Sequence, residues 1–374
     1  MRVLVCGASG CVGRAVARAL RSRGHQVVEG TRAPADGRAT LPIDFMEPTA
    51  PAVWAHRLAD RQVDAVVNCV GILMPARGQS FARVHTEGPA ELFRGAATAG
   101  VRRVVQVSAL GVGHDPDSLA TPYLHSKLLA EEALAALPID GVVVRPSLVY
   151  GPGSRSAALF ATLASLPVVS LPGRGTQPLA PIHVYELAEA IVRLVERPEP
   201  LRGVLELGGG EVVNCRTMLS RYREALGLGD AVWLPVPMAL MAFGAWLAEA
   251  APQRVFCRDT LRLLARGNVP AVNATAGLLG REPSTLAHGL AITAPEPMVD
   301  LRVALSPVVA WALRLSLAVM WLGAAFASVL LHRDAAATAL LVLLGASALN
   351  TVVGLLILSR PSPGHGSPTG RRHR

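Results

Sequence analysis

Residues 2–13 read RVLVCGASGCVG, and this stretch decides the fold. A short run of valine and leucine is followed by glycines at positions 7, 10 and 13, and an Ala/Val/Leu pattern with helical spacing continues to about Arg23. The order predicts a strand, a tight turn and a helix. Glycines at this spacing let a backbone turn sharply and approach a pyrophosphate at the positive end of the helix. We therefore predict a dinucleotide-binding turn made by Gly7, Ser9, Gly10, Cys11, Val12 and Gly13.

The alternation of strands and helices continues through the first 150 residues. Apolar runs and helical stretches follow one another, and continuous apolar strands between helices indicate a parallel sheet that is covered on both faces. The runs lie at 25–29, 65–70, 104–107 and 142–144, and the helical stretches near 51–60, 81–99 and 123–137. We predict an α/β fold with a Rossmann-type doubly wound parallel sheet in residues 1–150. Because the alternation decays afterwards, residues 151–299 are predicted to form a smaller, mixed substrate-side lobe.

Composition and charge exclude several classes of protein. Of 374 residues, 51% are hydrophobic and 17% are charged, which excludes intrinsic disorder. The formal net charge is +9, but four of these charges are the arginines after Asp334, so no basic face is left to bind nucleic acid. The five cysteines have no paired metal spacing, and their odd number argues against a disulfide framework. We predict no metal site and no nucleic-acid partner.

The C-terminal part has the composition of a membrane segment. Residues 315–331 and 335–359 are runs of 17 and 25 residues without a charge. A two-helix transmembrane hairpin is predicted over 307–359, followed by a basic disordered tail over 360–374. Arginines before and after the hairpin place both ends on the cytoplasmic side of the inner membrane, with membrane lipid as a partner. The alternative is a buried helical pair in a soluble dimer; a homo-oligomer also stays open.

The end of the second predicted strand bears on the choice of cofactor. Residues 25–32 read HQVVEGTR. An acid at this tip favours a free ribose 2′-hydroxyl, and an arginine favours a 2′-phosphate. Glu29 comes slightly early and Arg32 is well placed, with Arg14 as a second cation, so NADP(H) is preferred and NAD(H) stays open. Asp44 and Phe45 are candidates for holding the adenine.

A tyrosine and a lysine lie four residues apart at the start of a predicted helix. Lys127 is the only lysine among 36 basic residues, which favours a need for a compact ammonium at this position. Tyr123 and Lys127 project from one face, and the ammonium is expected to lower the pKa of the tyrosine. Ser108 ends the preceding strand, where its hydroxyl is a candidate to bind a substrate oxygen. A solvated helix face is the alternative for the pair.

These residues together resemble the short-chain dehydrogenase/reductase superfamily, in its extended, epimerase-type pattern. The resemblance covers roughly residues 1–292. More narrowly, VVNCVGIL (66–73), VSAL (107–110) and RDTLRLL (258–264) resemble the atypical branch that includes the nucleotide-binding accessory subunit of respiratory complex I. The hairpin resembles the first half of the DoxX-like membrane modules that follow some bacterial reductases.

The resemblance implies roles for individual residues. Catalytic Ser108, Tyr123 and Lys127 are implied, with Tyr123 as the proton donor to a carbonyl and Lys127 also binding the nicotinamide ribose. Asn68, Val70 and Gly71 are implied cofactor contacts. Arg155, after a Gly-Pro-Gly turn, is a candidate for binding an anionic substrate or for a surface ion pair.

We therefore expect a membrane-anchored NADP(H)-dependent oxidoreductase that acts on a small hydrophobic carbonyl or quinone-like compound. Two other functions stay open. One is a nucleotide-binding assembly or sensor protein without chemistry. The other, suggested by Tyr150-Gly151-Pro152, is a nucleotide-sugar epimerase or dehydratase.

Overall fold

The computed structural model describes most of the first 293 residues of the chain. The described residues are 1–33, 39–76, 78–113, 121–249 and 255–293, with positions 305, 308–310 and 316–317. The chain divides into two compact units, Met1–Pro295 and Glu296–Arg374, and the fold described here is that of the first. The predicted hairpin (307–359) and tail (360–374) lie almost wholly outside the described residues. Within the described ranges, each helix is too short or too polar to span a bilayer.

Seven parallel strands form the central sheet, which confirms the predicted Rossmann-type fold. The order across the sheet is β11–β6–β5–β4–β1–β2–β3, so the chain reverses direction across the sheet between β1 and β4. Ligands of open parallel sheets bind outside the carboxyl ends of the strands at such a switch point. The strands are β1 (Arg2–Cys6), β2 (Gln26–Thr31), β3 (Thr40–Pro42), β4 (Ala65–Asn68), β5 (Arg103–Val107), β6 (Asp140–Pro146) and β11 (Gly203–Leu207).

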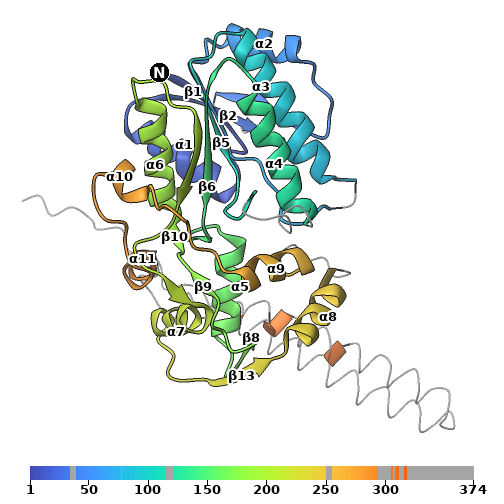
Figure 1. The fold of residues 1–374 in the computed structure, drawn as a ribbon, viewed down its shortest axis with the longest axis vertical. Helices are drawn as coiled ribbons and strands as arrows, with labels where there is room; N and C mark the ends of the chain where they lie inside the picture. Colours follow the sequence, from blue (N-terminus) through green and yellow to red (C-terminus); the bar gives the residue numbers. More distant parts are fainter. Residues whose placement is uncertain are drawn as a thin grey trace, which may run out of the picture. The chain divides into compact units, whose positions relative to one another are not determined.

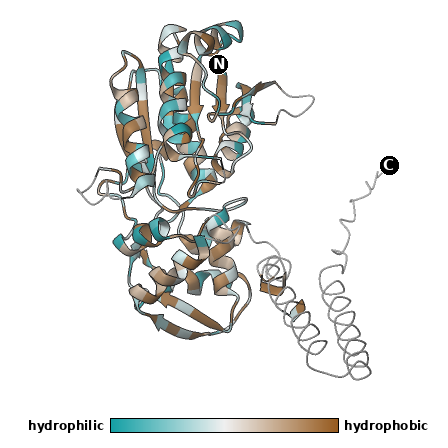
Figure 2. Ribbon diagram, turned by 90° about the vertical axis from the view of Figure 1, so that its right-hand side faces the viewer, coloured by the Kyte–Doolittle hydropathy of each residue, from teal (hydrophilic) through white to brown (hydrophobic). Residues whose placement is uncertain are grey.

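Helices cover both faces of this sheet (Figure 1). Side chains of β1 alternate, so Val3 and Val5 belong to the core under one helical layer, and Leu4 and Cys6 to the core under the other. The first layer holds α1 (Cys11–Ser22), α6 (Val184–Glu196) and α10 (Thr275–Leu279). The second holds α2 (Pro51–Asp60), α3 (Gly88–Thr98), which follows the π-helical turn η1 (Ala82–Glu87), and α4 (Pro122–Ala135). Apolar strands lie between these helices in Figure 2.

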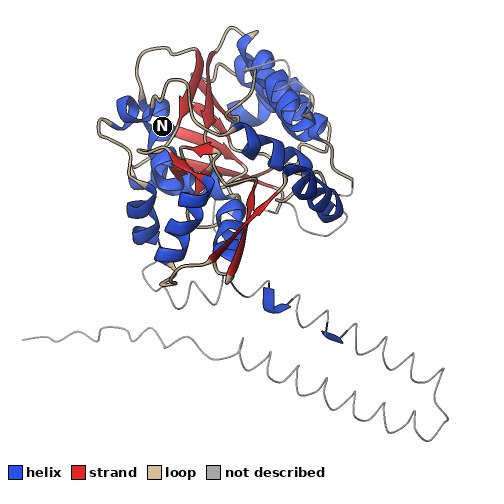
Figure 3. Cartoon of the chain, turned by 60° about the horizontal axis from the view of Figure 1, so that its bottom comes forward, coloured by secondary structure: helices blue, strands red, loops and turns tan. Residues whose placement is uncertain are grey.

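A smaller lobe packs around its own core, which includes Tyr150, Leu171 and Leu219. Its strands form three two-stranded sheets, and helices surround them (Figure 3). The strands are β7 (Val149–Tyr150), β8 (Val168–Pro172), β9 (Pro178–Leu179), β10 (Ile182–His183), β12 (Val213–Asn214) and β13 (Val232–Val236). The helices are α5 (Arg155–Ala164), α7 (Cys215–Ala225), α8 (Met238–Glu249), α9 (Arg258–Arg266) and α11 (Leu286–Thr293).

Elements on the far side of the boundary that we predicted near residue 150 also belong to the large sheet and its helical layers. Helix α6 packs on α1, and β11 pairs with β6 at the edge of the large sheet, so part of 151–299 belongs structurally to the nucleotide-binding half. Parallel strands need a long crossover connection. The connection from β6 to β11 runs from β7 to α6 and includes much of the smaller lobe. Sequence periodicity does not reveal this return, because β11 is a five-residue strand with an ordinary composition.

Candidate functional site

The glycine turn after β1 has the geometry that the sequence predicts. Gly7 has a φ of 75°, in the left-handed region, and Gly10 N donates to Gly7 O over 2.9 Å. A Cβ on residue 13 would lie 2.2 Å from Gly7 O, so only glycine lets α1 start this close to the strand. Among the described residues, no side chain caps α1 at Gly10, and the N-terminal N–H groups are available to an anionic ligand.

A cavity of about 920 Å³ follows the carboxyl edge of the sheet and extends between α5, α8 and α9. It brings together nearly all of the predicted site residues. Those of the cofactor set that line it are Gly7, Ser9, Gly10, Cys11, Val12, Arg14, Arg32, Asp44, Phe45, Val70, Gly71 and Lys127, and Ser108, Tyr123 and Arg155 line it too. Gly13 and Asn68 do not line the cavity. Gly13 instead permits the close packing of the turn.

Asn68 lies behind the cavity wall, so a direct contact with the cofactor stays a prediction. Its side chain is fully buried at the end of β4. Its Oδ1 accepts from Val70 N over 3.2 Å, and its Nδ2 donates to Gln106 Oε1 over 2.7 Å. The residue therefore shapes the loop at Val70 and Gly71, which does line the cavity.

At the end of β2, Glu29 contacts α1, whereas Arg32 lines the cavity. Glu29 is buried and pairs with Arg21 of α1, with Nη2 and Oε1 2.5 Å apart. Arg32 is exposed and lines the cavity. Of these two side chains, only the cation lines the cavity.

Asp44 and Phe45 line the cavity beyond β3. Phe45 is buried and packs edge-on against Trp54 of α2, with ring centroids 6.3 Å apart. Asp44 Oδ1 accepts from Met46 N over 3.0 Å, as the acid of a local turn does. Phe45 therefore offers a fixed apolar surface for a base, while the Asp44 carboxylate is partly committed to its own loop.

Tyr123 and Lys127 project from the first turns of α4 into the cavity, as their spacing predicts. Lys127 is 3% exposed, and its Nζ donates to Val107 O over 3.2 Å. Burial lowers the pKa of Lys127 to about 8, against the opposing charges of Glu131 and Cys69. Burial also raises the pKa of Tyr123 to about 12. The expectation that the ammonium lowers the tyrosine pKa is wrong for this structure, because desolvation of the phenolate dominates.

Ser108 lines the cavity, but its proton is engaged elsewhere. Its Oγ donates to Glu131 Oε1, a buried carboxylate one helical turn beyond Lys127. Arg145 of β6 holds the other oxygen of Glu131, with Nη2 and Oε2 2.6 Å apart. In this arrangement the Ser108 hydroxyl can accept a hydrogen bond from the cavity but cannot donate one to a carbonyl. This qualifies the predicted role of Ser108.

His85, on the π-helical turn η1, belongs to the same assembly and was not among the predicted residues. It is 1% exposed; its Nε2 accepts from Ile72 N over 3.0 Å, and its Nδ1 lies 2.9 Å from Ser126 Oγ. Ser126 Oγ in turn donates to Tyr123 O. Burial, with the charge of Lys127 as a smaller cause, lowers the pKa of His85 to about 2, so the ring is neutral. His85 therefore joins the loop after β4 to the helix that carries Tyr123.

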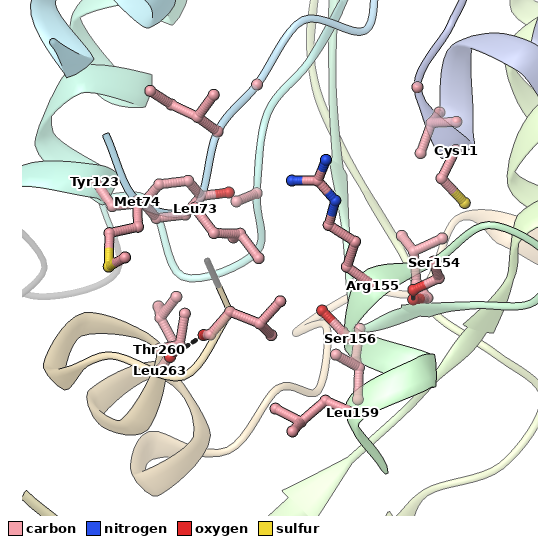
Figure 4. A pocket seen from close by; sticks show the side chains of 18 of the residues that line it. Cys11, Leu73, Met74, Tyr123, Ser154, Arg155, Ser156, Leu159, Thr260 and Leu263 are labelled. Atoms are coloured by element: carbon pink, nitrogen blue, oxygen red, sulfur yellow. Dashed lines mark hydrogen bonds between the residues drawn. The ribbon is translucent and has the colours of Figure 1, made fainter. Parts of the chain in front are cut away.

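The far half of the cavity is largely apolar, with a few polar side chains such as Ser156 and Thr260 and one cation. Arg155 begins α5 after the Ser154 cap, and its side chain makes no hydrogen bond or ion pair with the described residues. Figure 4 shows its guanidinium reaching into the pocket, between Tyr123 with Leu73 on one side and Cys11 on the other. The surrounding wall is built by Leu73, Met74, Leu159, Phe160, Leu163, Met241, Phe256, Leu263 and Leu264. A group of three or more metal-ligating side chains is absent from the described residues.

Comparison with known proteins agrees with this geometry. Residues 3–210 match the model of the NAD dependent epimerase/dehydratase family, which is more than half of the chain, and the chain belongs to this family. A Streptomyces 3-diazoavenalumate denitrifying reductase is 28% identical over 274 residues, covering 65% of this chain and 88% of that protein. The mouse NADH dehydrogenase [ubiquinone] 1 alpha subcomplex subunit 9 is 24% identical over 255 residues, covering 66% and 65%. The predicted likeness to that complex I subunit is thus confirmed.

Solved structures with the same fold include enzymes of nucleotide sugars. MoeE5 in complex with UDP-glucuronic acid and NAD superposes with a TM-score of 0.60 at 23% identity, covering 79% of this chain and 98% of that one. UDP-glucuronic acid 4-epimerase from Bacillus cereus gives 0.58 at 18% identity, covering 79% and 99%. These likenesses establish the fold. The family match ends at residue 210, so the DoxX-like resemblance of 307–359 stays a prediction.

Proposed function

We propose that the protein is a membrane-anchored, NADP(H)-dependent reductase that acts on a hydrophobic carbonyl or quinone-like compound. One observation carries the proposal: a single cavity joins the glycine turn at Gly7, the pair Tyr123 and Lys127, and a largely apolar wall. A polar cradle that continues into an apolar chamber suits a charged cofactor beside a lipophilic substrate.

The residues present fit a dinucleotide. The three glycines keep the turn free of side chains, and a Cβ on Gly71 would lie 3.3 Å from Lys127 Nζ, so glycine keeps that wall open too. When bound, NADP(H) supplies the hydride. Arg32 would hold the 2′-phosphate, and Lys127 would bind the ribose next to the nicotinamide. Tyr123 would give its proton to the carbonyl oxygen, and its raised pKa keeps that proton in place at neutral pH.

The names of two relatives favour a reductive reaction, and one of the two names a lipid. The Streptomyces relative is named a reductase. A ceramide reductase of Caulobacter vibrioides is 28% identical over 209 residues, covering 55% of this chain and 63% of that protein. The apolar side chains of the cavity, such as Leu159 and Leu263, would accommodate a chain or ring of this kind.

The anchoring part of the proposal rests on sequence. Uncharged runs at 315–331 and 335–359 have the length of membrane spans, and the arginines that flank them favour a cytoplasmic location for both ends. We place the protein in the inner membrane with its nucleotide-binding unit in the cytoplasm, as a monomer or a homo-oligomer. Extraction with alkaline carbonate tests this location, and release of the protein into the supernatant would contradict it.

Two measurements on the full chain test the reductase. Fluorescence titration should show NADPH bound more tightly than NADH, and Arg32→Ala should remove about tenfold or more of the NADPH affinity, as expected for a lost charged hydrogen bond. Arg18→Ala, an exposed arginine of α1 outside the cavity, is the control. Equal affinities for the two coenzymes would remove the NADP(H) preference.

The second measurement is turnover on a substrate found by screening aldehydes, ketones and quinones. Tyr123→Phe should lower kcat by about 10²–10⁴-fold while NADPH binding persists, because only the proton donor is lost. Unchanged turnover would refute the assigned mechanism. Tight NADPH binding with no oxidation across the panel would instead favour the non-catalytic, nucleotide-binding alternative.

One observation favours a second candidate function, the epimerase or dehydratase of a nucleotide sugar. Arg155 carries a positive charge into the cavity without an acidic partner among the described residues, which suits a diphosphate. Binding of UDP-glucose that Arg155→Ala abolishes would support this candidate. No binding at millimolar concentration would leave the reductase.

A further inference from the structure

Helix α8 exposes a stripe of large apolar side chains. Leu240, Phe243, Trp246 and Leu247 are 58, 55, 52 and 53% exposed, and their spacing places them on one face of the helix. Ala245 is the only buried residue of α8. An apolar helix of this length is usually a core helix. This one, at the edge of the smaller lobe (Figure 1), is not.

The apolar surface extends beyond the helix. No charged residue occurs from 231 to 248, although 17% of the chain is charged. Within this stretch, strand β13 exposes Val232 and Leu234 by 65 and 50%, and Val168 of the paired strand, in register with Val232, is 47% exposed. Exposed apolar side chains thus continue along the chain from β13 into α8, and exposed apolar surface of this extent marks an interaction site.

The face of α8 next to this stripe forms part of the cavity wall. Met241 and Gly244 line the cavity, and Leu240 both lines it and is exposed, so it lies at the mouth. The helix is held at its end by Glu249, whose carboxylate accepts from Arg258 Nε and Nη2 of α9 over 3.0 Å each. One wall of the substrate chamber is therefore a single helix whose outer face is also apolar.

We propose that this face of α8 lies in the headgroup boundary of the bilayer, so that the cavity opens toward the membrane and takes a lipid-dissolved substrate past Leu240. The inference rests on the proposed anchoring and gives the substrate its route. The helix has 12 residues, about 18 Å at ~1.5 Å per residue, which is too short to span a hydrocarbon core of ~30 Å. It therefore lies along the interface.

A bilayer fits the face better than a second protein. Phe243 and Trp246 pack ring to ring, with centroids 5.7 Å apart, and tryptophan is enriched at membrane–water interfaces. The chain reaches the first uncharged run, at residue 315, only 22 residues after α11 ends at Thr293. A stretch of this length reaches a membrane on which the unit lies.

The test uses the full chain in vesicles of phosphatidylcholine and phosphatidylglycerol whose acyl chains are brominated at carbons 6,7 or 11,12. Bromine quenches tryptophan at its own depth, and each of the five tryptophans can be removed singly. We expect Trp246→Phe to remove a component of the emission that the 6,7-lipid quenches more than the 11,12-lipid. Trp54→Phe, which removes a 2% exposed core ring, should leave the quenched component unchanged.

A second pair of variants separates the effect of a charge on the stripe from a general effect of substitution on folding. Leu247→Glu places a charge on the stripe and should reduce the quenching of Trp246, whereas Val272→Glu, a 77% exposed position outside it, should not. Quenching of Trp321 but not of Trp246 would overturn the inference and leave the anchor intact. If neither Trp246 nor Trp321 is quenched, the result contradicts both this inference and the proposed anchoring. Dimerisation of the detergent-solubilised protein that Leu247→Glu abolishes, without quenching, would assign the face to a second copy and also overturn it.

Discussion

Lys127 and Tyr123 show how burial sets the chemistry of single side chains. Desolvation disfavours the charged form of each group, so it lowers the pKa of Lys127 to about 8 and raises the pKa of Tyr123 to about 12. Tyr123 therefore keeps its proton at neutral pH. The protonated phenol is the form that can donate to a carbonyl oxygen.

The lowered pKa of Lys127 predicts a pH dependence of stability. The unfolded chain binds this proton up to its ordinary pKa near 10.5, whereas the folded protein loses it near 8. Between these values the unfolded state binds more protons, so the contribution of Lys127 to stability rises with pH. Its full size is on the order of 3 kcal/mol. Chemical unfolding from pH 7 to 10.5 should show this rise in the wild-type protein relative to Lys127→Met, and parallel curves would contradict it.

The Ser108 hydroxyl should matter more for structure than for proton transfer. Because it donates to the buried carboxylate of Glu131, Ser108→Ala should lower the free energy of unfolding by about 1–3 kcal/mol. It should lower kcat less than Tyr123→Phe does. Ser22→Ala, at an exposed helix end, is the stability control. The measurements are denaturant unfolding and single-substrate kinetics, and a loss of turnover as large as that of Tyr123→Phe, at wild-type stability, would show that Ser108 acts on substrate.

At the scale of elements, the β1–α1 turn depends on one missing Cβ. An alanine at Gly13 would put its Cβ 2.2 Å from Gly7 O and 2.7 Å from Gly7 C, and backbone atoms cannot move aside as a flexible side chain can. We expect Gly13→Ala to destabilise the protein by about 1–3 kcal/mol, the cost of overpacking, and to abolish NADPH binding. Gly277→Ala, in helix α10 with no atom within 4 Å of its new Cβ, is the matched control. Unaltered binding by Gly13→Ala would refute the predicted cradle.

The elements also show what the sequence can and cannot predict. The glycine turn and the Tyr123–Lys127 pair could be predicted because their geometry is fixed by neighbours within a few residues. The roles of Glu131 and His85 could not, because each depends on partners 23 and 41 residues away that only the fold brings close. The return of β11 to the large sheet is non-local in the same way.

At the scale of the whole molecule, one buried arginine connects the two halves of the nucleotide-binding unit. Arg103 of β5 is 1% exposed and pairs with Asp140 at the start of β6, with Nη2 and Oδ2 2.5 Å apart. Its Nη1 donates to Leu194 O and, over 2.7 Å, to Arg197 O, and its Nη2 donates to Glu199 O over 2.6 Å. These carbonyls belong to the end of α6 and the segment that leads to β11. The arginine therefore fixes the return of the chain to the sheet.

Removal of the Arg103 side chain should lower the free energy of unfolding of the whole nucleotide-binding unit. Arg103→Met removes the guanidinium from the Asp140 carboxylate and from three carbonyls, and breaking a buried pair in this way costs about 3–5 kcal/mol. Arg193→Met is the matched control: it lies on α6, its side chain is 44% exposed, and its ion pair with Glu189 is worth at most about 0.5 kcal/mol. Denaturant unfolding monitored by circular dichroism measures both variants. Equal stabilities would mean that the pairing of β11 with β6 and the packing of Leu205 and Leu207 suffice to hold the sheet edge without Arg103.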